Sequence, residues 1–145
     1  MIICTGTGSI LDERSGSLLN ERIHIGIDLM SNRPDVLIMD MHNLQFNQGT
    51  FDIIFSSHSF EHALYPQKVA AEFIRIGKNR GIVGIEVPVN FETKGADIWD
   101  FRSVDGILSY FEPKIDTVLY EKFIPDEKNI RHGTDCVQVI FSLSK

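Results

Sequence analysis

The chain has 145 residues, of which 43% are hydrophobic and 23% are charged, so we expect a single globular domain spanning residues 1–145. A net charge of -6 excludes the basic surface that binding to a phosphate backbone requires. No apolar run reaches the roughly 18 to 20 residues that cross a bilayer, and the amino end lacks the pattern of a signal peptide. We therefore expect a cytoplasmic protein without a nucleic-acid or membrane partner.

Short apolar runs that stop on polar residues mark the first half of the chain. The runs expected to form buried strands are residues 2–4, 23–27, 36–39 and 51–55. A continuous apolar run is typical of a parallel strand that is buried on both faces. The polar residues that follow, Asp28, Asp40 and the segment 56–58, are therefore expected at the carboxyl edge of the sheet, where open α/β folds bind ligands.

The middle of the chain predicts a helix over residues 66–76. Pro66 suits the first helical position, and Gly77 follows the last helical residue. Residues 78–81 are expected to turn the chain into another apolar strand over residues 82–87. By contrast, residues 9–21 predict only a weak or broken helix, because serine and glycine interrupt the apolar positions.

The last third changes character. Residues 90–102 are expected to form a loop over the pocket, and Ser103 is expected to cap a short helix that ends before Pro113. Residues 115–123 and 136–143 predict two strands joined only by a loop. A direct strand–loop–strand connection implies an antiparallel strand pair at the carboxyl-terminal edge of an otherwise parallel sheet, whose strands alternate with helices.

Residues 51–62, FDIIFSSHSFEH, resemble the motif FDxxxSxxxxEH of class I S-adenosylmethionine-dependent methyltransferases, in particular the small-molecule, methyltransferase-11-like branch. Asp28 after a Gly-Ile pair and Asp40 are further matches. The segment WDFRS at 99–103 resembles, more weakly, relatives often associated with sugar modification. The resemblance implies an α/β, Rossmann-like, mostly parallel seven-stranded sheet flanked by helices, S-adenosylmethionine as cofactor, and methyl transfer to a small-molecule acceptor.

The resemblance also implies a cofactor site. Asp28 would hold the ribose hydroxyls, and its position 20 residues after Gly8 suits one strand–helix–strand unit. Asp40 would accept a hydrogen bond from the adenine amine, with Met41 and His42 beside the ring. The full set expected to contact the cofactor is Thr5, Gly6, Gly8, Asp28, Leu29, Asp40, Met41, His42, Ser56 and Ser57.

The glycine loop departs from the family pattern. The family has an acidic residue followed by Gly-x-Gly-x-Gly, whereas aligning Gly6 and Gly8 puts Cys4 at the first glycine and Ile2 at the acidic position. One expected contact to the methionine amino group is therefore missing, and so are the helices that usually precede this strand. The sequence leaves two explanations open: a fragment of a longer reading frame, or a pocket completed by another subunit, such as the partner in a homodimer.

Histidines near the end of the fourth run are the candidate catalytic residues. Methyl transfer mainly requires alignment of donor and acceptor, and an oxygen or nitrogen acceptor also needs a base. His58 and His62 are the candidates, with His132 a distant third. Residues 58–62 also match the zinc motif H-x-x-E-H, but that motif needs a helix and here follows a strand directly, so we expect no metal.

Two alternatives stay open from the sequence alone. The altered glycine loop suits a degenerate Rossmann-like domain that binds a ligand or a partner without catalysis. A nicotinamide-binding domain is a weaker alternative, because Leu11 stands where the third glycine of the dinucleotide fingerprint belongs. Cys4 and Cys136 are expected to be reduced thiols packed as small hydrophobes.

Overall fold

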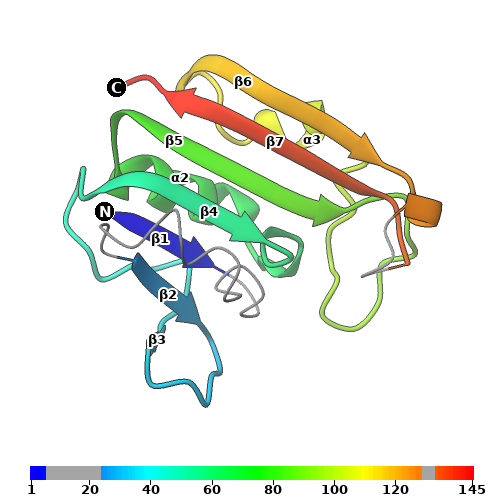
Figure 1. Ribbon diagram of the computed structural model, residues 1–145, viewed down its shortest axis with the longest axis horizontal. Helices are drawn as coiled ribbons and strands as arrows, with labels where there is room; N and C mark the ends of the chain where they lie inside the picture. Colours follow the sequence, from blue (N-terminus) through cyan, green and yellow to red (C-terminus); the bar gives the residue numbers. More distant parts are fainter. Residues whose placement is uncertain (6–23, 129–132) are drawn as a thin grey trace.

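The computed structural model describes residues 1–5, 24–128 and 133–145. Within them the chain forms a 7-stranded sheet in the order β3-β2-β1-β4-β5-β7-β6 (Figure 1). The strands are β1 (Ile2–Thr5), β2 (His24–Asp28), β3 (Val36–Ile38), β4 (Phe51–Ser57), β5 (Gly77–Pro88), β6 (Ile115–Ile124) and β7 (Cys136–Leu143). The helical segments are η1 (Phe60–His62), α2 (Pro66–Ile76), α3 (Val104–Leu108) and η2 (Asp126–Lys128).

The sheet is mostly parallel, as the sequence predicts. Strands β1 to β5 pair in parallel, whereas β7 lies antiparallel between β5 and β6. The predicted antiparallel pair at the carboxyl-terminal edge is therefore confirmed. Because β1, β2, β4 and β5 run in one direction, their carboxyl ends meet along one edge of the sheet (Figure 1).

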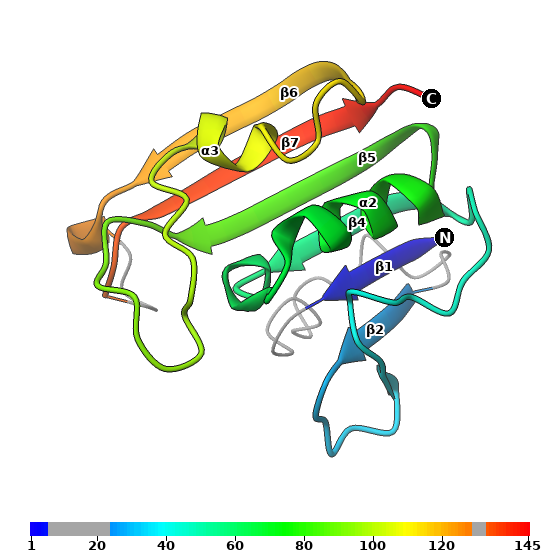
Figure 2. The same cartoon turned by 180° about the vertical axis from the view of Figure 1, so that it is seen from behind.

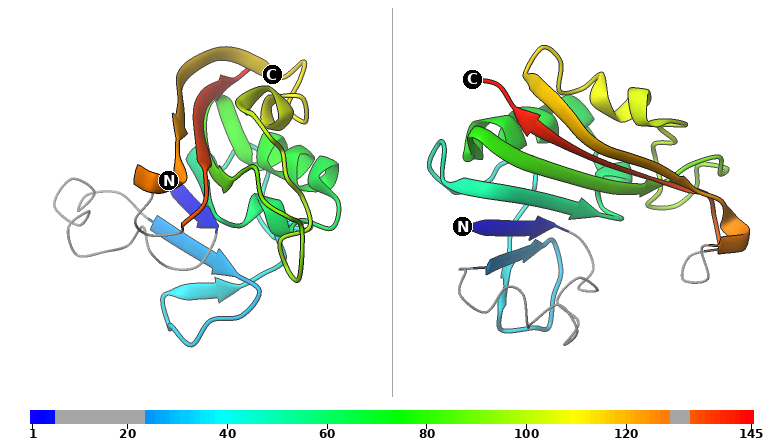
Figure 3. Two further views of the ribbon diagram at one scale, coloured as in Figure 1. Left: turned by 90° about the vertical axis from the view of Figure 1, so that its right-hand side faces the viewer. Right: turned by 45° about the horizontal axis from the view of Figure 1, so that its top comes forward.

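Helices α2 and α3 cover the same face of the sheet (Figure 2 and Figure 3). Helix α2 has the bounds predicted from the sequence, and its apolar stripe of Val69, Phe73 and Ile76 is fully buried. Helix α3 is capped as predicted, because the Ser103 side chain accepts a hydrogen bond from the Gly106 backbone N–H at 3.2 Å. Ile107 and Leu108 of α3 belong to the same apolar core as the stripe of α2 and the sheet.

Strand β3 differs from its prediction as a buried strand. Leu37 and Ile38 are 45% and 62% exposed. The strand is at the edge of the sheet and pairs only with β2, so it lacks the second neighbour that buries a central strand. Its apolar sequence indicated a strand correctly but not its position in the sheet.

The predicted turn at residues 78–81 is instead part of β5, which runs without interruption from Gly77 to Pro88. Its pairing with β4 moves from Phe51–Gly77 to Ile53–Ile82, so β5 carries extra residues opposite β4. Arg80 within this bulge has φ 60°, a left-handed conformation. The turn-forming residues thus make a bulge. The weak helix expected over residues 9–21 lies outside the described residues.

Replacing Phe73 with alanine tests this core. The ring is fully buried on α2, so Phe73→Ala should lower the free energy of unfolding by about 3 to 5 kcal/mol. Urea unfolding followed by circular dichroism measures the change. Gln67→Ala, on the exposed side of the same helix, is the matched control and should leave stability close to that of the wild type. Equal loss in both variants would contradict this assignment of the core.

Candidate active site

The carboxyl edge of the sheet carries two neighbouring cavities within the described residues. The smaller, of about 80 Å³, is lined by Thr5, Ile27, Asp28, Leu29, Met39, Met41, Ser59 and His62. The larger, of about 420 Å³, is lined by His58, Glu61, His62, Pro88, Phe91, Glu92, Lys94, Asp97 and Thr134. His62 lines both, so one side chain stands where the two spaces meet.

Asp28 closes β2 at the smaller cavity, as expected. Its Oδ1 accepts a hydrogen bond from the Met30 backbone N–H at 3.2 Å, and its carbonyl accepts one from Met39 at 2.9 Å. A carboxylate can accept further hydrogen bonds on its two oxygens. The apolar side chains of Ile27, Met39 and Met41 surround it. This combination of a carboxylate and an apolar wall fits a nucleoside.

Asp40 lies outside this cavity wall. Its carboxylate accepts hydrogen bonds from the His42 backbone N–H at 2.9 Å and the His42 ring Nδ1 at 2.6 Å. The backbone hydrogen bond, followed by the ring, holds the pKa of Asp40 below its usual value. The His42 Nε2 in turn accepts a hydrogen bond from the Tyr65 backbone N–H at 3.2 Å. Asp40 therefore orders the turn after β3, and its contact with adenine stays a prediction.

A chain of hydroxyl groups links β1 to β4. The Ser59 Oγ lies 2.9 Å from the Thr5 Oγ1 and 2.7 Å from the Ser56 Oγ. Ser56 is fully buried, and of the three only Thr5 and Ser59 line the smaller cavity. Ser57 points the other way and donates a hydrogen bond to the Glu86 Oε1 at 3.3 Å. Ser56 thus supports Ser59 in the cavity wall, whereas Ser57 contacts Glu86, and a contact of either with the cofactor stays a prediction.

Of the remaining cofactor residues expected from the sequence, Leu29 and Met41 line the smaller cavity. Leu29 is 62% exposed at its mouth. Gly6, Gly8 and the third histidine candidate, His132, lie outside the described residues.

His58 is held between two carboxylates. Its Nε2 lies 3.3 Å from the Glu86 Oε1, and its Nδ1 lies 3.7 Å from the Glu61 Oε1. Burial lowers the pKa of His58, but hydrogen bonds with Cys136 and Glu86 and the charge of Glu61 together raise it to about 10. The imidazole is therefore protonated at neutral pH. A protonated histidine cannot accept a proton, so this geometry favours His62 over His58 in acceptor activation.

Glu86 is the acidic partner of this pair. The hydrogen bond from His58 is the largest cause that lowers its pKa to about 2, with Gln138 and Ser57 adding to it against the effect of burial. Glu61 behaves differently, because burial raises its pKa. The two carboxylates that flank His58 therefore lie in unlike surroundings, and Glu86 is the one that is firmly ionised.

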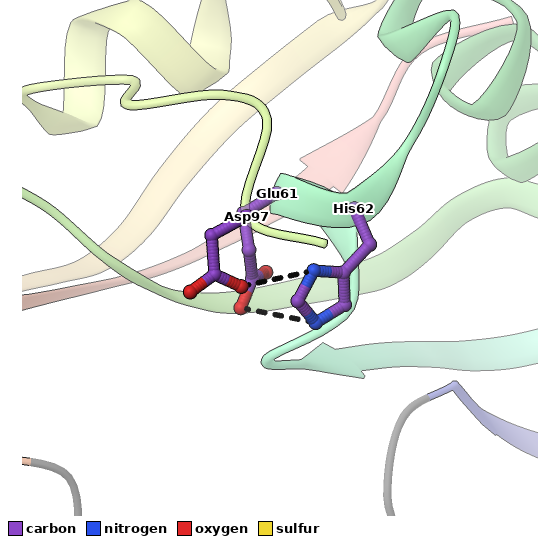
Figure 4. Close-up of side chains that lie close together, drawn as sticks. All are labelled: Glu61, His62 and Asp97. Carbon is purple, nitrogen blue, oxygen red and sulfur yellow. Dashed lines mark ion pairs between the residues drawn. The ribbon is translucent and has the colours of Figure 1, made fainter. Parts of the chain in front are cut away.

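His62 is surrounded by groups that accept hydrogen bonds. Its Nδ1 lies 2.9 Å from the Ala96 carbonyl oxygen and 3.1 Å from the Asp97 Oδ1, while its Nε2 lies 3.9 Å from the Glu61 Oε1 (Figure 4). The segment that contains Ala96 and Asp97 is fixed to η1, because the Glu61 carbonyl accepts hydrogen bonds from the backbone of Ile98 and Trp99 at 3.2 Å. The loop after β5 thus lies over the larger cavity, as predicted.

The aromatic residues of this loop divide into two roles. The Trp99 Nε1 donates a hydrogen bond to the Ala63 carbonyl at 2.8 Å, and the Phe101 ring stacks on Phe60 at 5.1 Å between centroids. Both side chains therefore attach the loop to the fold. Phe91 lines the larger cavity and is the aromatic residue placed to contact a ligand there.

Sequence reasoning missed several residues of the site, namely Met39, Ser59, Glu61, Glu86 and Asp97. Glu61 belonged to the motif at residues 51–62 but received no role. Glu86 interrupts the apolar run 82–87, and a lone carboxylate inside a buried strand was a usable signal. Asp97 lies in a polar loop, and no local pattern distinguishes it from its neighbours.

The comparisons with known proteins agree with this architecture. A family model described as "Methyltransferase domain" matches residues 16–85, slightly less than half of the chain. No curated protein matches the chain. None of the helices that the structure describes is long and apolar enough to cross a membrane.

Solved structures match over nearly the whole chain at low identity. A methyltransferase of Haloferax volcanii in complex with its Trm112 activator has a TM-score of 0.75 and 17% identity, covering 99% of this chain and 82% of that one. An S-adenosylmethionine-dependent methyltransferase of Aquifex aeolicus gives 0.67 and 18%, covering 98% and 81%. The 1,6-didemethyltoxoflavin-N1-methyltransferase of Burkholderia thailandensis, solved with its substrate and S-adenosylhomocysteine, gives 0.73 and 10%, covering 99% and 71%.

The shifted pKa values of His58 and Glu86 predict how the stability of the protein depends on pH. The raised pKa of His58 contributes stability that is complete below about pH 6.5 and is lost as the pH rises toward 10. The lowered pKa of Glu86 contributes stability that is complete above about pH 4.5 and is lost as the pH falls toward 2. Nuclear magnetic resonance should show the His58 ring still protonated at pH 8, and stability should decline from pH 6.5 to 10.

Glu86→Gln should lower the pKa of His58 and flatten the alkaline decline in stability. Glu92→Gln is the matched control, because Glu92 lines the same cavity without a contact to His58 among those identified. A His58 ring that loses its proton near its ordinary pKa in the wild type would contradict the assignment.

Proposed function

We propose that this chain is an S-adenosylmethionine-dependent methyltransferase, as its fold and the family match over residues 16–85 support, and that it methylates a small molecule bound in the larger cavity. The observation that carries the proposal is the position of His62. It lines the cavity that contains Asp28 and also the cavity beneath the loop after β5. Cofactor and acceptor bound on either side would meet at this histidine.

The described residues fit one end of the cofactor. Asp28 would bind the ribose hydroxyls, and Ile27, Met39 and Met41 would contact the flat base or the edge of the sugar. Thr5 and Ser59 offer hydroxyl groups on the side nearest β4. S-adenosylmethionine, when bound, supplies a methyl group on a positively charged sulfur. The protein has to align the acceptor with that group and keep water away.

The larger cavity, where we place the acceptor, has a lining that suits a polar molecule. Glu61, Glu92 and Asp97 contribute acidic groups, Lys94 contributes a cationic one, and Phe91 offers an aromatic surface. A cavity of about 420 Å³ accommodates a metabolite rather than a polymer. We assign activation of the acceptor to His62, since the ion pair with Glu86 keeps His58 protonated. Sugars and other metabolites stay the expected acceptor class.

The charge of the chain and its sequence also bear on its binding partners and its cellular location. The net charge of -6 supports a small-molecule acceptor in place of a nucleic acid. We expect the protein to work in the cytoplasm, and homodimer formation stays a prediction. A binding domain without catalysis is the competing function, since the glycine loop departs from the family pattern.

Titration calorimetry with S-adenosylhomocysteine tests the cofactor site. We expect micromolar binding that Asp28→Ala weakens by at least about tenfold, because the ribose hydroxyls lose their acceptor. Asp35→Ala is the matched control, since Asp35 pairs with Arg33 on an exposed turn and lines neither cavity. Absence of binding at millimolar ligand would overturn the proposal.

A second variant separates binding from catalysis. His62→Ala should leave the affinity for S-adenosylhomocysteine within a few fold of the wild type, but should reduce methyl transfer by about 10² or more. Radiolabelled S-adenosylmethionine and a panel of hydroxylated and amine metabolites provide the assay. Unchanged turnover in His62→Ala would refute the assignment of this residue. Tight binding with no transfer to any acceptor would favour the non-catalytic alternative.

A further inference from the structure

We propose that Glu61, His62 and Asp97 bind a divalent cation in the wall of the larger cavity, and that this cation holds a hydroxyl group of the acceptor. The second half of the proposal rests on the proposed methyl transfer. The first half concerns metal binding alone and stands independently of it.

The three side chains converge from two segments of the chain. Glu61 and His62 lie on η1, and Asp97 comes from the loop after β5 (Figure 4). One potential ligand atom from each lies within 4.8 Å of the others. Ligands at about 2.1 Å from one tetrahedral ion lie about 3.4 Å apart, so ligand atoms at the upper end of this range would have to close by somewhat more than about 1 Å. The Asp97 side chain is 45% exposed, and its Oδ1 lies 3.1 Å from the His62 Nδ1, so it would have to rotate toward Nε2 to share an ion with it.

The orientation of His62 suits a metal ligand. The Ala96 carbonyl oxygen, 2.9 Å from Nδ1, can only accept a hydrogen bond, so Nδ1 carries the proton. The lone pair is then on Nε2, which faces Glu61. Metal-binding histidines commonly donate the hydrogen of their second nitrogen to a backbone carbonyl in this way. The ring is thus fixed with its free lone pair toward the carboxylate.

Glu61 supplies the independent observation that this cluster lacks a ligand. The residue is 1% exposed and lines the larger cavity, yet its Oε2 forms no hydrogen bond within the described chain. A buried carboxylate oxygen without a partner is costly. The other oxygen, Oε1, lies 3.9 Å from the His62 Nε2, so a cation held by both oxygens of this carboxylate would also satisfy Oε2.

Acidic groups outnumber basic ones around the cluster, which favours binding of a cation. His58 lies 3.7 Å from the Glu61 Oε1, and its other ring nitrogen lies 3.3 Å from the Glu86 Oε1, so His58 is paired with a carboxylate outside the cluster. Among the described residues that line this cavity, the carboxylates of Glu61, Asp97 and Glu92 are accompanied by one lysine, Lys94. This site also differs from the H-x-x-E-H zinc motif, in which His58 would be a ligand. In this structure His58 is paired with Glu86, and Asp97 is the third proposed ligand in place of His58.

One imidazole and two carboxylates suit Mn²⁺ or Zn²⁺, and three protein ligands leave positions open toward the cavity. An acceptor hydroxyl bound there would lose its proton to water more easily. Its oxygen then forms a bond with the methyl carbon, while the bond from that carbon to sulfur breaks and the electron pair stays on sulfur. With the cation bound, His62 would contribute to acceptor activation as a metal ligand, and water would take the proton that His62 accepts in the metal-free reaction proposed above.

Titration of the full chain with Mn²⁺ tests the proposal. After removal of metals with a chelator, calorimetry and electron paramagnetic resonance should detect saturable binding of Mn²⁺. Asp97→Asn and Glu61→Gln should each weaken it by about tenfold or more. Glu92→Gln is the matched control, a carboxylate of the same cavity outside the cluster, and should bind as the wild type does. If Glu61→Gln fails to fold, Asp97→Asn carries the test.

The outcomes separate this proposal from the proposed function. Binding of S-adenosylhomocysteine without saturable binding of Mn²⁺, Zn²⁺ or Mg²⁺ would overturn the metal site and leave the methyltransferase assignment intact. Weakening of Mn²⁺ binding by Glu92→Gln to the same extent as by Asp97→Asn would also overturn it, as a nonspecific effect of charge. Mn²⁺ binding with no binding of S-adenosylhomocysteine would support the site and count against the proposed function.

Discussion

The packing of Phe60 holds the candidate site together. Its fully buried ring stacks on Phe101 at 5.1 Å and also contacts Phe73 and Phe111, with centroids at 6.4 and 5.9 Å. Aromatic rings at these distances contribute to stability both by burial and by their geometry. Because Phe60 begins η1, the same packing that anchors helix and loop also fixes the positions of Glu61 and His62. The positions of these two candidate site residues therefore depend on an apolar contact.

The short helix η1 also positions the polar groups of the two cavities on either side of it. Ser59, directly before it, bonds to Thr5 and so joins the wall of the smaller cavity. Glu61, within it, holds the loop after β5 through its carbonyl oxygen and faces the larger cavity through its carboxylate. A short segment thereby links the wall of the smaller cavity to that of the larger one.

The sequence predicted the parts of this protein that depend on local patterns. The bounds of helix α2 matched the prediction because its proline, its apolar stripe and the glycine after it lie within one segment. Asp28 was correctly predicted to lie at a cavity because it ends an apolar strand. The exposure of β3 depends on its place at the sheet edge, and the nearness of Asp97 to His62 depends on where a loop folds back. No pattern in the neighbouring residues of the sequence indicates either position, so only the structure could show them.

A crystal structure of the protein with S-adenosylhomocysteine tests the central claim most directly, that the two cavities meet at His62 and serve cofactor and acceptor. We expect the ribose hydroxyls to bind the Asp28 carboxylate and the ligand sulfur to be directed toward His62 and the larger cavity. A ligand bound away from Asp28, or with its sulfur directed away from His62, would contradict it.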